Sequence, residues 1–182
     1  MKFCFRPPRS APSATPRQGM ALICAGILSV GGWCGAVAAE RAAARAAAAY
    51  DVVVYGGKSG GVTAAVAAAR PGRTVVLIEP GRHLGGLTSG GLGATDIGKK
   101  ESIGGLAREF YQRVKRHYAN PGAWKYGRPG DFTSNQHDPK EDVMFYFEPH
   151  VAEQIYDDLA REANVEVVRG ERLDLKTGVV KR

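Results

Sequence analysis

Residues 51–79 read DVVVYGGKSGGVTAAVAAARPGRTVVLIE, in which two β-branched runs flank a glycine cluster and a run of small residues. The run at 51–55 predicts a strand that is buried on both faces, as strands of parallel sheets are. The small residues at 62–70 predict a helix that lies very close to a sheet. A second strand is predicted at 73–79. The order of strand, helix and strand predicts an α/β fold with a parallel sheet.

The glycine cluster between the first strand and the helix has the composition of a dinucleotide-binding turn. Gly56 is expected to permit a tight turn where a side chain would clash, and Gly61 to let the helix approach the strand closely. The free N–H groups that open the helix, at its positive dipole end, form a site for a pyrophosphate. The predicted residues of this turn are Gly56, Gly57, Lys58, Ser59, Gly60 and Gly61.

Glu79 and Lys58 affect this prediction in opposite directions. Glu79 ends the second strand 23 residues after Gly56. There its carboxylate accepts hydrogen bonds from an adenosine ribose and disfavours the 2′-phosphate of an NADP-type ligand. Lys58 occupies the position of the second glycine of a G-x-G-x-x-G motif, where its charge helps to neutralise phosphate but its Cβ takes up room. The alternative is an α/β unit of another kind with a glycine-rich turn.

The segment PGRHLGGLTSGGLG at 80–93 distinguishes a flavin-binding domain from one that binds only a nicotinamide cofactor. With this segment, the chain resembles the FAD-dependent oxidoreductases of the glutathione-reductase-like superfamily, which have Rossmann-like FAD/NAD(P)-binding domains. It is most similar to a branch of exported bacterial flavoproteins, some of which carry xanthan-lyase-like labels. The shared stretches are DVVVYGGKSGGVTAAVAAAR, VVLIEPGRHLGGLTSGGLGATD and YFEPHVAEQIYDDLAREANVEVV. The resemblance covers residues 50–182.

This resemblance implies contacts along the whole FAD molecule. Glu79 would hold the adenosine ribose, with Pro80 beside it, and the backbone at Val168 would border the adenine. Gly85 and Gly86 would lie against the diphosphate and the ribityl chain. The small residues that follow would lie near the isoalloxazine ring: Thr88, Ser89, Gly90 and Gly91.

The remaining candidate groups are an arginine, the histidines and the cysteines, and none of them receives a definite role. Arg82 would either pair with a cofactor phosphate or face water. No catalytic residue is predicted, because the flavin ring accepts the hydride and the protein supplies orientation and electrostatics. The four histidines show no metal spacing, so no metal site is predicted. All three cysteines lie in the first 34 residues, which excludes a disulfide framework or a catalytic thiol in the body of the chain.

Beyond residue 100 the sequence predicts two helices, two strands and a hairpin. The helix at 102–118 has an apolar stripe that is expected to pack in the core, made of Ile103, Leu106, Phe110 and Val114. A long loop at 119–141 follows, of the kind that often carries substrate contacts. The remaining elements are a strand, a helix, a strand and a β-hairpin, at 143–147, 148–163, 165–168 and 171–182. The second helix buries the stripe Val151, Ile155 and Leu159.

The predicted domain at 50–182 follows an N-terminal leader. Residues 1–39 combine a basic start, an uncharged stretch and the A-x-A pattern at 36–38, which predict a secretory signal peptide. An uncleaved N-terminal membrane anchor is the alternative, because the uncharged stretch reaches the lower limit for crossing a bilayer. Residues 40–49 are an alanine-rich linker. We therefore expect an exported protein, periplasmic or secreted, that touches a membrane only through this segment.

The net charge of +7 does not indicate a nucleic acid partner. Residues 1–39 contribute +4, and the remainder has 21 basic and 18 acidic residues, a net charge of +3. The densest basic run, at 113–117, is interpreted as the solvated face of a helix. The expected partner is therefore a small-molecule substrate.

Together these features predict the N-terminal, FAD-binding portion of an FAD-dependent oxidoreductase, whose flavin accepts a hydride or electrons from a substrate. The predicted fold is a Rossmann-like α/β domain that is incomplete at its C-terminus, because the closing motif and the substrate domain of the superfamily are missing. Two alternatives stay open. One is an NAD-binding dehydrogenase, and the other is a non-catalytic exported protein, associated with polysaccharide handling, that keeps the nucleotide-binding fold.

Overall fold

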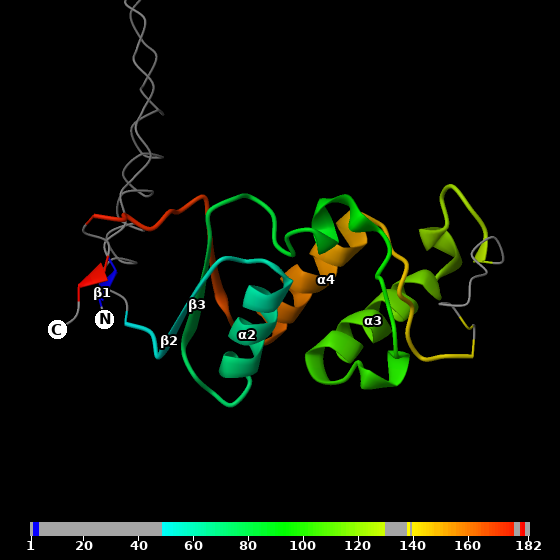
Figure 1. The fold of residues 1–182 in the computed structure, drawn as a ribbon, viewed down its shortest axis with the longest axis horizontal. Helices are drawn as coiled ribbons and strands as arrows, with labels where there is room; N and C mark the ends of the chain where they lie inside the picture. Colours follow the sequence, from blue (N-terminus) through cyan, green and yellow to red (C-terminus); the bar gives the residue numbers. More distant parts are fainter. Residues whose placement is uncertain (1, 4–48, 130–137, 139, 177–178, 181–182) are drawn as a thin grey trace, which may run out of the picture. The chain divides into compact units, whose positions relative to one another are not determined.

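The structure, a computed structural model, describes residues 2–3, 49–129, 138, 140–176 and 179–180. The chain divides into two compact units, Tyr50–Arg172 on the one hand and Met1–Ala49 with Leu173–Arg182 on the other. In the smaller unit, β1 (Lys2–Phe3) pairs antiparallel with β5 (Val179–Val180). The larger unit contains a sheet and several helices (Figure 1).

The sheet of the larger unit confirms the predicted parallel α/β architecture. Its strands are β2 (Val52–Tyr55), β3 (Val75–Glu79) and β4 (Glu166–Arg169), in the order β2-β3-β4, and both neighbouring pairs are parallel. The central strand β3 is buried from residue 75 to residue 78. Because the strands run in one direction, their carboxyl ends meet at one edge of the sheet, which is where such folds place ligands.

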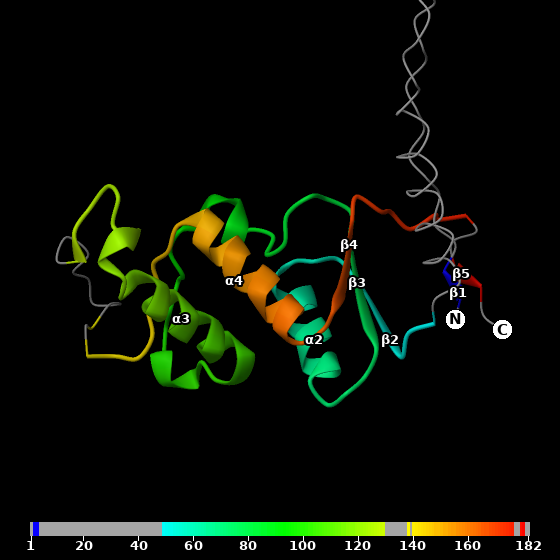
Figure 2. The same ribbon diagram turned by 180° about the vertical axis from the view of Figure 1, so that it is seen from behind.

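Two helices pack together on this sheet. α2 (Ser59–Ala69) lies beside α4 (Pro149–Glu162) in both views of the ribbon (Figures 1 and 2). Val62 of α2, Leu77 of β3 and Leu159 of α4 belong to one buried cluster. Each fully buried aliphatic side chain of this kind contributes about 1.5–3 kcal/mol. The small residues of α2 therefore allow close approach to the sheet without loss of a packed core.

The helix predicted at 102–118 begins three residues later than expected, as α3 (Gly105–Tyr118). Lys100–Ser102 forms a separate 3-10 turn, η2, so that Ile103 lies outside the helix and does not continue its stripe. The rest of the stripe is confirmed, with one further member, and these residues are buried or partly buried in the core: Leu106, Phe110, Val114 and Tyr118.

The strand predicted at 143–147 is wrong. Within this segment Tyr146 makes an isolated bridge to Ala94, and the N–H of Met144 donates to the carbonyl oxygen of Tyr111 at 3.2 Å. The segment is apolar because it fills the core without joining a sheet, and its buried residues are Val143, Met144, Phe145 and Phe147. A short apolar run indicates burial but does not distinguish a strand from other buried chain.

The C-terminal predictions are confirmed up to β4 and diverge after it. The helix predicted at 148–163 is α4, whose predicted stripe is buried, and the strand predicted at 165–168 is β4. Asn164, with a φ of 56°, ends the helix in the left-handed conformation. The hairpin predicted at 171–182 is not observed as such, because β5 pairs with β1, and residues 177–178 lie outside the described residues.

Several predictions concern parts of the chain that are described only in fragments. The loop at 119–141 contains a 3-10 turn, η3 (Pro121–Ala123), while residues 130–137 and 139 are outside the described residues. The predicted signal peptide and linker, at 1–49, are also outside them except for residues 2–3 and 49. None of the helices in the described ranges has the length and hydropathy needed to cross a bilayer.

Candidate functional site

The turn between β2 and α2 begins at Gly56, whose backbone has a φ of 100°. Its N–H donates to the carbonyl oxygen of Ile78 at 2.7 Å, which ties the turn to β3. The sequence predicted that a side chain would clash at this position. That reason is wrong, because a Cβ added here would meet nothing within 4 Å. The requirement is conformational: a positive φ is strained for any residue with a side chain.

Gly61 is required by space, as predicted. A Cβ at this position would lie 1.8 Å from the carbonyl oxygen of Gly56. Gly57 is similarly enclosed, since a Cβ there would lie 2.5 Å from a methyl carbon of Leu84. Two of the glycines therefore allow α2 and the segment after β3 to pack directly on the turn.

Glu79 lies at the end of β3 and faces the turn. Its carboxylate accepts a hydrogen bond from the N–H of Gly57 through Oε2 and one from the N–H of Gly81 through Oε1, both at 2.6 Å. An ionised carboxylate has about four lone-pair sites, so two acceptor positions are not used by these backbone groups. The acid is thus held in place and can still accept hydrogen bonds from a ligand.

The start of α2 provides a positive end beside this carboxylate. Lys58 is the N-cap residue, with φ −65° and ψ 169°, and no side chain caps the helix. The first N–H groups of a helix have no intrahelical acceptor. The first turn also holds no acidic residue, so the helix dipole is not compensated there. This arrangement suits the two negative charges of a diphosphate.

The segment Gly85-Gly86 lies against the glycine turn. The N–H of Gly85 donates to the carbonyl oxygen of Gly57 at 2.7 Å, and Lys58 and Gly85 form a parallel bridge. A Cβ on Gly86 would lie 3.2 Å from the Cβ of Lys58. The Cβ of Lys58, which was expected to take up room in the turn, therefore borders this segment.

Tyr156 of α4 is a contact that the sequence did not reveal. A Cβ on Gly85 would lie 2.7 Å from its ring. Burial raises the pKa of Tyr156, while hydrogen bonds with Thr88 and Ser59 act in the opposite direction. Tyr156 therefore connects three parts of the predicted cofactor site: the start of α2, the Gly85-Gly86 segment and the residues expected near the flavin ring. Only the contact between α4 and these loops in three dimensions identifies it.

The remaining predicted residues surround the same strand ends. The hydroxyl of Ser89 donates to the carbonyl oxygen of Leu84, and Ser89 and Thr88 lie in or at the irregular turn η1 (Thr88–Leu92). Val168 pairs with Ile78, next to the pair of Glu79 with Arg169. Two further residues follow Glu79 closely, Pro80 partly buried and Arg82 exposed.

The chemistry of these groups suits the binding of a cofactor. In the described ranges of the chain, no group of three His, Cys, Asp or Glu side chains can hold a metal ion. The site instead combines a glycine turn, an uncapped helix start and a fixed carboxylate at the carboxyl edge of a parallel sheet. Such a combination defines a dinucleotide-binding α/β domain.

Comparison with known protein families agrees with this class. The chain belongs to the FAD-dependent oxidoreductases, because the model of that family matches residues 51–182. FAD is accordingly its cofactor. The family match favours the flavin interpretation of the segment at 80–93. Comparison with curated protein sequences finds no match.

Two of the solved structures that match this chain are similar to it over part of their length. The THI4 protein of Thermovibrio ammonificans has 16% sequence identity and a TM-score of 0.45, over 79% of this chain and 47% of that chain. The second, AlpK, has 21% identity and a TM-score of 0.33, over 66% of this chain and 24% of that chain. This chain thus covers less than half of the length of either structure.

Proposed function

We propose that this chain supplies the adenosine-diphosphate part of an FAD site in an oxidoreductase that acts on a small-molecule substrate. The observation that supports this proposal most directly is the position of the Glu79 carboxylate, 2.6 Å from the N–H of Gly57. Glu79 retains acceptor positions for ribose hydroxyls. The uncapped start of α2 lies after the same turn and offers N–H donors for phosphate oxygens.

Each part of the site receives a role on this proposal. The turn Gly56–Gly61 binds the diphosphate, with the Lys58 ammonium as a counter-charge. Gly85 and Gly86 border the diphosphate and the ribityl chain. The other assigned residues are Pro80 and Arg82 beside the ribose and phosphates, Thr88 and Ser89 near the flavin ring, and Val168 near the adenine.

Bound FAD supplies a ring that accepts a hydride or electrons from the substrate. The chain contributes binding and orientation. Tyr156 lies against Gly85 and interacts with Thr88 and Ser59, so it helps to position the loop at Thr88 relative to α2. We assign no residue of this chain to proton transfer.

The proposal is tested with the full chain, purified, mixed with FAD and passed through a desalting column. We expect flavin absorbance to remain with the protein, and an excess of NAD⁺ to leave it there. Displacement of the flavin by NAD⁺ would favour a nicotinamide-dependent dehydrogenase. A protein that stays colourless at any FAD concentration would favour a non-catalytic role for this polypeptide.

We further propose that residues 1–39 direct export to the periplasm or the medium. The support is the sequence pattern of a basic leader, an apolar stretch and small residues at 36–38. Cell fractionation and the mass of the recovered protein test this. Recovery from the periplasm with a mass that corresponds to loss of the leader supports cleavage, whereas full-length protein in the membrane fraction supports an anchor.

A further inference from the structure

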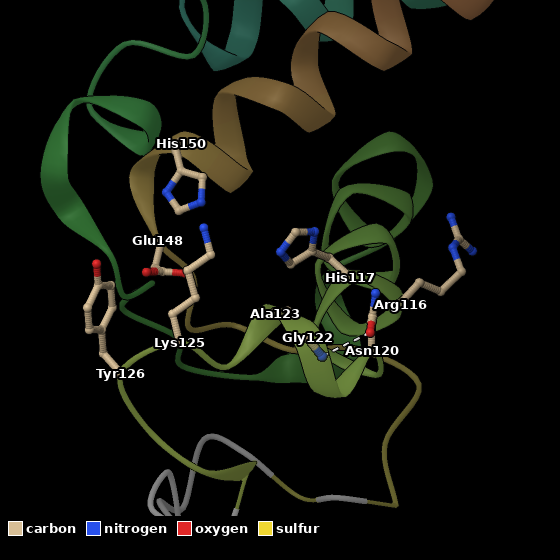
Figure 3. A pocket seen from close by; sticks show the side chains of 9 residues that line it. All are labelled: Arg116, His117, Asn120, Gly122, Ala123, Lys125, Tyr126, Glu148 and His150. Atoms are coloured by element: carbon tan, nitrogen blue, oxygen red, sulfur yellow. Dashed lines mark hydrogen bonds between the residues drawn. The ribbon is translucent and has the colours of Figure 1, made fainter.

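A hollow of about 620 Å³ lies where α3 ends and α4 begins, and it shares no lining residue with the glycine turn. Three basic side chains point toward its space in Figure 3: His117 of α3, Lys125 after η3, and His150 of α4. Arg116, which also lines the hollow, points away from this space. The three groups come from separate elements, so only the folded chain brings them together.

These three side chains form no ion pair within the described residues. Other basic residues of the same unit do, among them Arg70 with Glu109 at 2.8 Å and Lys100 with Glu141 at 3.1 Å. The hollow therefore has an excess of hydrogen-bond donors.

Among the described residues, Glu148 is the one carboxylate that lines the hollow, and it accepts a hydrogen bond from the protein. Its Oε2 accepts a hydrogen bond from the hydroxyl of Tyr118 at 3.1 Å, and its backbone N–H donates to the same hydroxyl oxygen at 2.8 Å. Tyr118 thus fixes Glu148 at the wall. The two imidazoles and the ammonium group face the space beside Glu148 as hydrogen-bond donors.

An apolar chamber of about 200 Å³ adjoins the hollow and shares Ala123, Lys125, Tyr126 and Glu148 with it. Its wall includes Trp124, whose indole N–H donates to the carbonyl oxygen of Tyr118 at 2.8 Å and so fixes the ring. Further wall residues are Met144, Tyr146 and Phe147. A flat apolar group is the natural occupant of such a chamber.

We infer that the hollow and the chamber form one binding site for an organic acid with a flat apolar body. The carboxylate of the ligand binds to Lys125, His117 and His150, and its apolar body lies against Trp124. An imidazole has at least one N–H donor in either protonation state, so both histidines contribute hydrogen bonds across the physiological pH range. The described residues hold no metal-binding cluster that would explain the two histidines otherwise.

The same site indicates a substrate class for the oxidoreductase. Gly93 lines the apolar chamber and directly follows η1, the turn assigned to the flavin ring. An acid in this chamber would therefore lie next to the segment that carries the ring. This last step rests on the proposed function, whereas the binding of the acid does not.

The experiment uses the full chain with Trp33→Phe, which leaves Trp124 as the only tryptophan. Phenylacetate is titrated while tryptophan fluorescence is recorded. Two probes serve for comparison: phenylacetamide, which lacks the negative charge, and acetate, which lacks the aromatic ring. We expect phenylacetate to change the fluorescence saturably and to bind more tightly than either probe. Lys125→Ala should raise its Kd about tenfold, as expected for loss of a charge-assisted hydrogen bond. Lys99→Ala, at an exposed lysine outside the site, should leave the Kd unchanged.

Three results would overturn the inference: no saturable response to phenylacetate, equal binding of phenylacetamide, or equal binding of acetate. His150→Ala provides a second test, because alanine removes the imidazole donor, and an unchanged Kd in either variant would also contradict the site. FAD binding is measured by absorbance on the same preparation. Retained flavin with no phenylacetate binding refutes this site alone, whereas phenylacetate binding without flavin refutes only the proposed FAD site.

Discussion

The carboxylate of Glu79 accepts a hydrogen bond from the N–H of Gly57 at 2.6 Å, although the two residues are 22 positions apart in the chain. This bond joins the end of β3 to the turn that follows β2. The same carboxylate binds the N–H of Gly81, so it is held from both sides. An acid that is oriented before the ligand arrives loses less conformational entropy on binding.

The two glycines at the start of α2 should respond differently to alanine. Gly61→Ala places a Cβ 1.8 Å from the carbonyl oxygen of Gly56, whereas a Cβ at Gly60 meets nothing within 4 Å. We expect Gly61→Ala to destabilise the fold by about 2 kcal/mol or more. Gly60→Ala should be neutral or stabilise it by up to about 1 kcal/mol. Urea unfolding of both variants measures this, and equal midpoints would contradict the close packing of α2.

Lys58 is an unfavourable N-cap residue in the free protein. It makes no capping hydrogen bond, and its charge lies at the positive end of the helix dipole. Its extended backbone suits a capping serine. We therefore expect Lys58→Ser to raise the free energy of unfolding by about 0.5–1 kcal/mol. Thermal unfolding without ligand is the measurement, and a lower melting temperature in the variant would show that the lysine stabilises the turn.

Glu109 of α3 should stabilise the fold only above acidic pH. Hydrogen bonds from Arg70, the larger cause, and from Arg113 lower the pKa of Glu109 from 4.5 to about 2. Because the pKa is lower in the folded state than in the unfolded state, the stabilisation is present above pH 4.5 and is lost as the pH falls toward 2. For this partly exposed group, its size is on the order of 1 kcal/mol.

The variant Glu109→Gln tests this pH dependence. Its deficit in unfolding free energy relative to the wild type should be largest near neutral pH and should shrink on acidification. Glu101→Gln, at an exposed residue, is the control and should follow the wild type at every pH. A deficit that does not change with pH would mean that the carboxylate contributes through packing only.

The Tyr118 hydroxyl should have a raised pKa and should stabilise the start of α4. Burial is the main cause that raises the pKa of Tyr118 to about 12. Tyr118→Phe leaves the N–H of Glu148 without its acceptor, which we expect to cost about 1–3 kcal/mol. In an ultraviolet titration, the wild type should show one tyrosine that ionises near pH 12, and this tyrosine should be missing from the variant. Loss of a tyrosine that ionises at an ordinary pH would contradict the burial.

The first βαβ unit could be predicted because its determinants are local. The β-branched runs at 51–55 and 73–79 and the glycines between them specify strands and a turn within 29 residues. The acid at the end of the second strand follows from the same pattern. The prediction for residues 143–147 is wrong because a short apolar run reports burial and not hydrogen bonding.

The rest of the candidate site depends on contacts between distant segments. Tyr156 reaches Thr88 and Ser59 from another helix, and no spacing in the sequence relates these three residues. The same holds for His117 and His150, which show no metal spacing in the sequence and which line one hollow from two helices. For Gly56, the sequence predicted the residue correctly but not the reason for it. Glycine is required there by the positive φ and not by a clash.

The central claim is that FAD binds at the glycine turn with Glu79 as the acceptor for its ribose. The most direct measurement is the Kd of FAD for the full chain, by isothermal titration calorimetry, for the wild type, Glu79→Gln and the control Glu101→Gln. We expect saturable binding to the wild type and the control, and a Kd about tenfold or more higher for Glu79→Gln, because a charge-assisted acceptor is lost. An unchanged Kd in Glu79→Gln, with both variants folded, would contradict the assignment of the ribose to this carboxylate.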